Sequence, residues 1–456
     1  MGKKFDFEYI IVGSGPAGSA AATALAEAKK RVAIVEADTF GGASLNHSEI
    51  PYAASRKFSH LCAEIRRGGK LGVSALNLHF NLPTAVAWQR AVIKNVGGGD
   101  TGRFEAKNIT CIKGKANFLD AHTIAVGEQK YTADNFILAT GSKNITNTIG
   151  GADKVFHLTP ETAMKVRRVP KAVLVVGGGK AGCETAEYFA ELGSKVLIME
   201  MSERILPSED REVSETISDY FVHDLGMMVV PNTRVVALEE DDAGKRVVFV
   251  NGGQEKMVKI DTIVLAIGSK PILDYGLENA GVKYRKNGVV VDKELRTSAK
   301  NIFAIGGAVD SKITTEKAIY QGTFLANMLT TKSKNILNYH GFPRTINTYP
   351  EVAVVGLTED DLIKRSRKYK KAIVYLDEVT ASKTSEFERG FIKLLADKDK
   401  KIIGAVIVAP NASLMVQELA VAVRHHLSAL EIASTPHLAN SFGEAIRLAA
   451  KQLIKK

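Results

Sequence analysis

Cysteine is scarce in this sequence: its 456 residues include only Cys62, Cys111 and Cys183. None stands in a Cys-x-x-Cys or other metal-ligand spacing, which argues against a thiolate metal site and against a disulfide-rich secreted scaffold. No apolar run reaches the roughly 18–20 residues of a membrane span, so no transmembrane segment is expected. Residues 1–15 enter a strand pattern at once and carry no secretory signal. These absences together predict a cytoplasmic protein.

Low-complexity tracts are also missing, and the composition is that of a folded chain, with 45% hydrophobic and 24% charged residues. The length suggests two to four domains. The net charge is +11, and its densest basic run spans 364–371. This run is either a contact for an anionic surface or a solvated loop, and the second reading is favoured. No aromatic residues interleave with it, so nucleic acid is not an expected partner.

One pattern occurs twice. Residues 8–36 and 173–200 each read as an apolar strand, a glycine-rich turn, an alanine-rich or apolar helix and a second strand that ends in glutamate. The distance from first glycine to glutamate is 23 residues in both copies. A single G-x-G-x-x-G is a weak signal, but strand, helix and terminal acid in two matched copies predict two doubly wound domains.

The residues of each copy have separate roles in binding a dinucleotide. The first glycine permits the tight turn, the second lets the backbone approach a pyrophosphate, and the third lets helix and strand pack closely. The helix N-terminus presents unpaired N–H groups to the phosphates, and the acid accepts hydrogen bonds from a ribose diol. These residues are Gly13, Gly15, Gly18 and Glu36 in the first copy, and Gly177, Gly179, Gly182 and Glu200 in the second.

The pattern changes near residue 340. Four short apolar runs follow, and helical stretches are expected at 411–427 and 441–455. This alternation predicts a separate C-terminal α+β domain.

Several motifs, in a fixed order, resemble the pyridine nucleotide–disulfide oxidoreductase family, the group of lipoamide dehydrogenase, glutathione reductase and mercuric reductase. The resemblance covers nearly the whole chain. The segments that carry it are 134–142 (DNFILATGS), 261–271 (DTIVLAIGSKP), 297–310 (TSAKNIFAIGGAVD), 345–359 (TINTYPEVAVVGLTE) and 390–409 (GFIKLLADKDKKIIGAVIVA).

The resemblance implies an α/β fold with two doubly wound, Rossmann-like dinucleotide-binding domains and a C-terminal α+β dimerisation domain. It implies FAD in the first site, a nicotinamide dinucleotide in the second, and a homodimer formed through the C-terminal domain. We expect an FAD-binding part at 1–147, an NAD(H)-binding domain at 148–269, a return to the FAD domain at 270–338 and a dimer-interface domain at 339–456.

Further cofactor contacts are implied by position in the family's motifs. On the FAD side they are Gly42, Ala43, Thr140, Gly141 and Gly306, and on the NAD side Gly268.

The segment 41–53 carries the most informative departure from the family. In the family, the corresponding G-G-x-C-L-N-x-x-C-I-P-x-K motif holds two cysteines as a redox disulfide beside the flavin. This chain reads GGASLNHSEIPYA, with Ser44 and Glu49 at the cysteine positions and Ala53 at the lysine position. No thiolate or disulfide can form there, so a disulfide reductase is not expected.

Other positions depart as well. Aligning on Glu444 places Ala439 where the family has the histidine that protonates the departing thiol, and His437 lies two residues earlier. Gly307 stands where the family's aspartate holds the ribityl chain of FAD. Without that charge-assisted hydrogen bond, FAD binding should weaken by about 1–3 kcal/mol unless a water or Asp310 substitutes.

Four side chains are candidates for the chemistry. Glu49 is a candidate acid or base beside the flavin, or else a polar filler hydrogen-bonded to Ser44. Lys180 occupies the position of the family's flavin-covering residue, and it either reaches the cofactor site or faces solvent. Glu184, which in the family partners the missing lysine, is retained.

Glu200 bears on the choice of nicotinamide dinucleotide. A carboxylate accepts from a 2′-hydroxyl and repels a 2′-phosphate, so NADH is favoured over NADPH. Arg204 is the residue that would reverse this preference if it turned back toward the ribose.

The lost residues all serve disulfide chemistry, whereas both dinucleotide motifs are intact. This pattern favours an FAD-dependent NADH oxidoreductase that passes electrons directly to a small acceptor such as a quinone, a diaphorase-like activity. Two alternatives stay open: a non-catalytic nucleotide-binding or assembly protein on the same fold, favoured by Gly307 and Ala53, and a nicotinamide transhydrogenase.

Overall fold

The computed structural model describes residues 5–73, 79–242, 244–331, 336–385 and 387–455. The chain divides into two compact units, each assembled from segments that are distant in sequence. The first comprises Met1–Thr146, Leu158–Val169 and Ile267–Asn338, and the second comprises Asn147–His157, Pro170–Ala266 and Tyr339–Lys456.

The first unit is built on a seven-stranded sheet with the strand order β3-β2-β1-β6-β5-β4, and β18 also pairs with β6. The β1, β2, β3, β6 and β18 pairings are parallel, while β4 and β5 pair antiparallel. The bounds are β1 (Phe7–Val12), β2 (Val32–Glu36), β3 (Thr110–Lys113), β4 (Ala116–Asp120), β5 (Thr123–Val126), β6 (Gln129–Leu138) and β18 (Ile302–Ala304).

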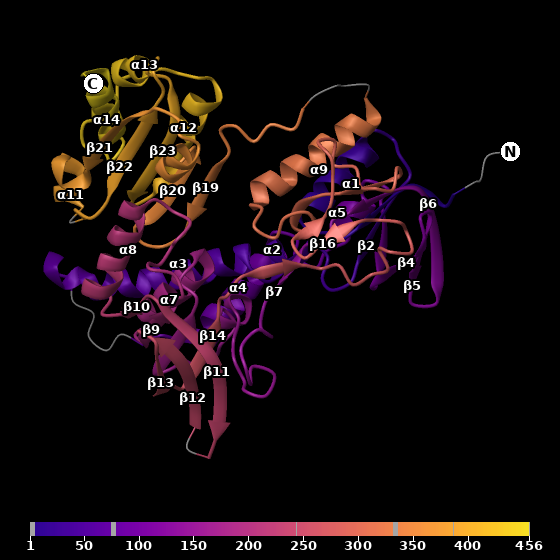
Figure 1. The fold of residues 1–456 in the computed structure, drawn as a ribbon, viewed down its shortest axis with the longest axis horizontal. Coiled ribbons are helices and arrows are strands. Elements are labelled where there is room, and N and C mark those ends of the chain that lie inside the picture. Colours follow the sequence, from indigo (N-terminus) through magenta and orange to yellow (C-terminus); the bar gives the residue numbers. More distant parts are fainter. Residues whose placement is uncertain (1–4, 74–78, 243, 332–335, 386, 456) are drawn as a thin grey trace. The chain divides into compact units, whose positions relative to one another are not determined.

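Both faces of this sheet are covered, which is why its central strands read as unbroken apolar runs. Alternate residues of β1 enter different hydrophobic clusters: Ile11 packs in one with α1 and α9 residues, and Ile10 packs in the other. Figure 1 shows indigo α1 beside orange α9. Gly322 permits this approach, because a Cβ there would lie 2.3 Å from the Ala17 carbonyl oxygen.

The helices of this unit are α1 (Pro16–Glu27), α2 (Gly42–Asn46), α3 (Glu49–Arg67), η1 (Gly68–Leu71), α4 (Leu82–Asn95), α5 (Gly102–Glu105), α6 (Pro160–Ala163), η2 (Gly306–Ala308) and α9 (Thr315–Thr330). Its remaining strands form two small antiparallel sheets, β7 (Ser142–Asn144) with β15 (Ser269–Pro271) and β16 (Tyr284–Arg285) with β17 (Gly288–Val289).

The second unit begins with a parallel four-stranded sheet of order β10-β9-β8-β14 and an antiparallel three-stranded sheet β11-β12-β13. The parallel strands are β8 (Ala172–Val176), β9 (Lys195–Met199), β10 (Met228–Val230) and β14 (Thr262–Leu265). The others are β11 (Thr233–Asp241), β12 (Gly244–Asn251) and β13 (Gln254–Lys259), and the helices of this part are α7 (Lys180–Leu192) and α8 (Arg211–His223).

The same unit ends in an antiparallel five-stranded sheet of order β19-β20-β23-β22-β21. Its strands are β19 (Pro343–Ile346), β20 (Glu351–Gly356), β21 (Lys370–Tyr375), β22 (Phe391–Ala396) and β23 (Ile402–Ala409). The accompanying helices are α10 (Glu359–Lys364), η3 (Leu376–Glu378), α11 (Thr380–Thr384), α12 (Ala412–Arg424), α13 (Ala429–Ser434) and α14 (Glu444–Lys455). Among the described residues, no helix combines the length and apolarity that crossing a bilayer requires.

The predicted fold class is confirmed: two doubly wound sheets precede a C-terminal α+β domain. The predicted helices at 411–427 and 441–455 correspond to α12 and α14. The sequence reading missed α10, α11 and α13, because each is only five or six residues long and too short to show helical periodicity. The domain boundaries stay predictions.

Candidate functional site

The first glycine turn joins β1 to α1. Gly13 has φ +108°, and a Cβ there would lie 2.2 Å from the Ala139 carbonyl oxygen. A Cβ on Gly18 would lie 2.0 Å from the Gly13 carbonyl oxygen. By contrast, a Cβ on Gly15, the N-cap of α1, would meet nothing within 4 Å. Gly13 and Gly18 are therefore required by the fold, while Gly15 leaves open space at the helix N-terminus.

The second turn, between β8 and α7, repeats this geometry. Gly177 has φ +102°. A Cβ on Gly182 would lie 1.9 Å from the Gly177 carbonyl oxygen, whereas a Cβ on Gly179 would meet nothing within 4 Å. Both turns thus provide an open helix N-terminus of the kind that binds a pyrophosphate.

Glu36 and Glu200, the glutamates that end the two repeats, are positioned by similar hydrogen bonds. Glu36 accepts hydrogen bonds from the backbone N–H of Ser14 (2.9 Å) and Asp38 (2.8 Å), and also from the Ser14 hydroxyl. Glu200 accepts from the backbone N–H of Gly178 (2.6 Å) and Ser202 (2.7 Å). Both residues are 8% exposed, and these hydrogen bonds hold Glu36 at the end of β2 and Glu200 directly after β9.

Helix α2 begins against the first turn. The Gly41 N–H donates to the Ser14 hydroxyl at 2.9 Å, and a Cβ on Gly42 would lie 2.5 Å from the Gly15 Cα. Ala43, next in the helix, is exposed. The 41–53 segment, in which serine and glutamate replace the family's two cysteines, therefore contacts the glycine turn that the sequence assigns to FAD.

An oxygen cluster, defined as Ser44, Glu49 and Thr315, includes both positions where the family has its redox cysteines, Ser44 and Glu49. The Ser44 and Thr315 hydroxyls each donate to Glu49 Oε2 at 2.6 Å, and the two hydroxyl oxygens are 3.2 Å apart. Glu49 is the first residue of α3 and Thr315 the first of α9. The predicted Ser44–Glu49 hydrogen bond is present. Thr315 was missed because it is 266 residues from Glu49 in sequence.

The cysteines lie outside this cluster. Cys62 and Cys183 are buried and Cys111 is half-buried, and all three are free thiols. Burial raises the pKa of Cys111 to about 11, and burial raises the pKa of Cys183 well above its ordinary value. Both thiols therefore stay protonated and weakly nucleophilic near neutral pH.

Residues 297–310, which the sequence assigns to the return to the FAD domain, include the short helix η2. A Cβ on Gly307 would lie 3.1 Å from Gly141 backbone atoms, so an aspartate would fit there only with a backbone shift. The Asp310 carboxylate accepts from the Lys312 N–H at 2.9 Å. Gly306 donates its N–H to Gln321 at 2.6 Å, and Thr140 donates its hydroxyl to the Ile272 carbonyl at 3.1 Å.

Three nicotinamide-side candidates have different surroundings. Lys180, at the start of α7, is exposed. Glu184 is buried in the same helix and accepts from the N–H and the side-chain amide of Asn347, at 2.8 and 3.1 Å. Gly268 has φ +104°, and a Cβ on it would meet nothing within 4 Å.

The C-terminal acid–base residues are paired differently from the family's pattern. His437 Nε2 lies 3.0 Å from Glu418 Oε1, and its Nδ1 lies 2.9 Å from the Thr435 carbonyl oxygen. Glu444 instead pairs with Arg447 in α14, and this guanidinium, with a smaller contribution from His437, lowers the pKa of the Glu444 carboxyl. A His–Glu dyad on Glu444 is therefore not formed.

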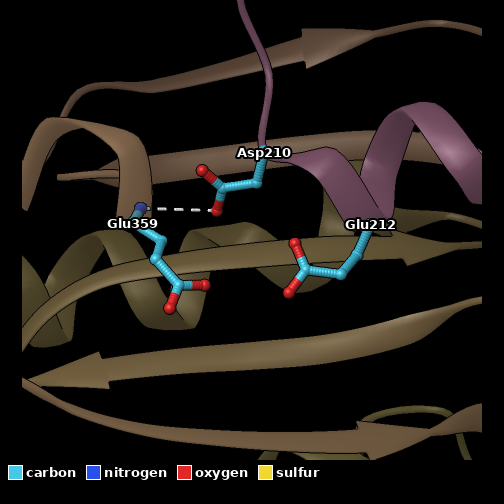
Figure 2. A group of neighbouring side chains, drawn as sticks. All are labelled: Asp210, Glu212 and Glu359. Atoms are coloured by element: carbon cyan, nitrogen blue, oxygen red, sulfur yellow. Dashed lines mark hydrogen bonds between the residues drawn. The ribbon is translucent and has the colours of Figure 1, made fainter. Parts of the chain in front are cut away.

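A partly buried charge cluster lies in the second unit and contains none of the predicted site residues. Figure 2 shows Asp210, Glu212 and Glu359 with their carboxylates converging. Lys393 Nζ lies 2.6, 3.0 and 3.2 Å from their oxygens, and its side chain is fully buried. Burial disfavours the ammonium, but hydrogen bonds and charge from Asp210 and Glu212 raise the pKa of Lys393 above its ordinary value. The lysine therefore takes the place that a cation would need.

Two dinucleotide-type turns on doubly wound sheets, followed by an antiparallel domain, define the class of two-dinucleotide flavoprotein oxidoreductases. Residues 7–322 match the family model for pyridine nucleotide-disulphide oxidoreductase, and residues 342–450 match the dimerisation domain of that family. The chain belongs to the pyridine nucleotide-disulphide oxidoreductase family, whose members bind FAD and NAD(P)H.

Similar proteins agree with this placement. Dihydrolipoyl dehydrogenase from Geobacillus stearothermophilus is 32% identical over 452 residues, which cover 97% of this chain and 95% of that protein. The Bacillus subtilis dihydrolipoyl dehydrogenase is 30% identical over 454 residues, with 98% and 96% covered. Among solved structures, LpdA from Mycobacterium tuberculosis has a TM-score of 0.87 at 25% identity, with 98% of this chain and 99% of that chain covered. The flavoprotein disulfide reductase RclA from Escherichia coli, at 0.85 and 21% with the same coverage, shares the fold.

Proposed function

We propose that the chain is an FAD-dependent NADH oxidoreductase that passes electrons from NADH through the flavin directly to a small quinone-like acceptor, without a disulfide. The oxygen cluster carries this proposal, because hydrogen-bonded Ser44 and Glu49 stand where the family keeps its redox cysteines. When bound, FAD supplies the two-electron chemistry that oxygen side chains lack. The inert thiols of Cys111 and Cys183 offer no substitute for the pair.

The residues around each turn suit a dinucleotide. The open N-terminus at Gly15 would receive the FAD diphosphate, and Glu36 would accept from its ribose. Gly179 and Glu200 would do the same for NADH. Gly42, Ala43, Thr140, Gly141 and Gly306 are the further candidates on the FAD side, with Gly268 on the NAD side.

The purified protein is expected to be yellow, and NADH without oxygen should bleach its flavin. No long-wavelength charge-transfer band should appear, because no cysteine thiolate lies in the 41–53 segment. Anaerobic visible spectra before and after NADH measure both features. A flavin that keeps its colour, or a thiol-dependent charge-transfer band, contradicts the proposal.

NADH is expected to exceed NADPH in kcat/KM by at least about tenfold, because Glu200 repels a 2′-phosphate. Arg204 is not available to offset this, since its guanidinium lies 2.7 Å from Glu203 and 3.7 Å from Asp360 and donates to the Glu209 carbonyl. Steady-state kinetics with both dinucleotides test the preference. Equal kcat/KM values would show that Glu200 does not read the ribose.

The match to the family's dimerisation domain supports a homodimer formed through the C-terminal part of the chain. The cytoplasmic location stays a prediction. Helix α12 exposes two apolar side chains one heptad apart, Leu414 at 73% and Val421 at 55%. Residues seven apart lie on one face of a helix, so these side chains are suited to a partner surface.

A non-catalytic nucleotide-binding protein is the second candidate, and Gly307 favours it. A Cβ on Gly307 would lie 3.1 Å from Gly141 backbone atoms, so the family's FAD-binding aspartate would fit there only with a backbone shift. This candidate predicts a colourless protein, so the spectrum described above separates the two.

A further inference from the structure

We propose that Glu49 is the acid that protonates the electron acceptor, and that Ser44 and Thr315 orient its carboxyl group for this step. The inference rests on the proposed function and adds a substrate class to it: acceptors that gain protons when they gain electrons, as quinones do.

The hydrogen bonds select one carboxyl oxygen as the donor. Both hydroxyls donate to Oε2 of Glu49 at 2.6 Å. From the part of the chain that the structure describes, Oε1 receives no hydrogen bond. In the protonated acid, Oε2 can remain the acceptor of both hydroxyls while Oε1 carries the proton. The cluster therefore holds the carboxyl group through one oxygen and leaves the other for proton transfer.

Glu49 is the only member of the cluster with a carboxyl group, the side-chain type that commonly serves as a general acid or base. Ser44 and Thr315 carry hydroxyl groups, which position the carboxyl by hydrogen bonds. A carboxyl group can act as a general acid when its surroundings position it for that role. Glu49 is also exposed, so water can return the proton after each turnover.

The three members come from three helices that are anchored around the first glycine turn. Ser44 lies in α2, which is fixed to the turn by the Gly41–Ser14 hydrogen bond. Glu49 and Thr315 are the first residues of α3 and α9, which are 19 and 16 residues long. α9 in turn packs along α1. Placement on helices rather than on mobile loops provides the fixed geometry that proton transfer needs.

The step balances for a quinone. The acceptor receives a hydride, which brings two electrons and one proton, and it takes the second proton from Glu49 Oε1. The O–H bond of the carboxyl group breaks as the second hydroxyl of the hydroquinone forms, and the carboxylate regains a proton from water. NADH and one proton are consumed for each hydroquinone and NAD⁺ produced.

Glu49→Gln in the holoenzyme tests the acid directly, because glutamine keeps the shape and removes the proton. Two acceptors are compared: menadione, which must be protonated, and ferricyanide, which takes electrons alone. The ratio of menadione to ferricyanide turnover should fall by about 100-fold, the lower range of a general acid's contribution. An unchanged ratio overturns the inference.

Thr315→Val and Thr315→Ser test the positioning role, since valine is nearly isosteric and serine restores the hydroxyl. The turnover ratio should fall in Thr315→Val and recover in Thr315→Ser. Equal ratios in the two variants would overturn the assignment of Thr315 as a positioning residue.

An infrared readout is independent of turnover. Spectra of the protein without NADH, recorded across the titration of its carboxyl groups, should contain a protonated-carboxyl band that Glu49→Gln lacks and Thr315→Val shifts. A band unaffected by Thr315→Val contradicts the orientation. Failure of the proposed function is distinguishable, because wild-type flavin would then resist bleaching by NADH.

Discussion

Gly15→Ala is expected to yield a folded protein that no longer retains FAD. The N-cap backbone at Gly15 has φ −62° and ψ −178°, which alanine adopts without strain, and the new Cβ meets no protein atom within 4 Å. The methyl group instead occupies the space where a pyrophosphate approaches the helix N-terminus. Loss of one or two charge-assisted hydrogen bonds, about 1.5–3 kcal/mol each, weakens binding by about 10- to 100-fold or more. Flavin absorbance after desalting measures the loss.

Gly179→Ala is the matched variant in the second turn. Its N-cap geometry, φ −74° and ψ −176°, is nearly the same, and the surrounding space is equally open. This variant should keep its flavin while the Kd for NADH rises about 10- to 100-fold, for the same reason. Gly69→Ala, also with no neighbour within 4 Å, serves as a control that should change neither cofactor. If Gly179→Ala lost FAD and Gly15→Ala weakened NADH binding instead, the assignment of FAD and NADH to the two turns would be reversed.

Lys393→Met is expected to lower the free energy of unfolding by about 3–5 kcal/mol, because removal of the ammonium leaves the buried Asp210 carboxylate without its ion-pair partner. Asp210 is 1% exposed at its side chain and loses an ammonium at 2.6 Å. Denaturant unfolding of the two proteins at equal pH gives the difference. The control is Lys383→Met, which removes a pair with Glu388 whose side chains are 57% and 54% exposed. That control should cost less than about 1 kcal/mol.

The loss of unfolding free energy in Lys393→Met should also depend on pH. Burial alone would raise the pKa of Glu359, but hydrogen bonds from Lys371 and Tyr369, with the charge of Lys393, lower it below the ordinary 4.5. A depressed carboxyl pKa contributes stability that is complete above the unfolded pKa and is lost as the pH falls through the folded one. The gap between wild type and variant should therefore narrow on acidification below about pH 4.5. A gap that is constant with pH would mean that the cluster contributes through packing alone.

Much of the fold followed from local patterns. The strand–turn–helix–strand repeats at 8–36 and 173–200 specify much of their own geometry, because the third glycine of each repeat faces the carbonyl oxygen of the first, five residues earlier. The loss of both redox cysteines from the 41–53 segment was also predictable, because residue identities can be read from the sequence alone. The environment of the basic run at 364–371 was harder to predict from the sequence. Lys371 proved to be partly engaged by Glu359, while positions 364 to 368 are exposed.

The sequence by itself determined the two dinucleotide motifs, the missing redox pair and the C-terminal α+β domain. The tertiary structure alone decided that Thr315 completes the cluster around Glu49, that Lys393 pairs with Asp210, Glu212 and Glu359, and that His437 lies against Glu418 rather than Glu444. The reason is physical. A turn or a helix is set by neighbours in the chain, whereas a hydrogen bond between residues 266 apart depends on how α3 and α9 are packed. No periodicity in the sequence records that packing.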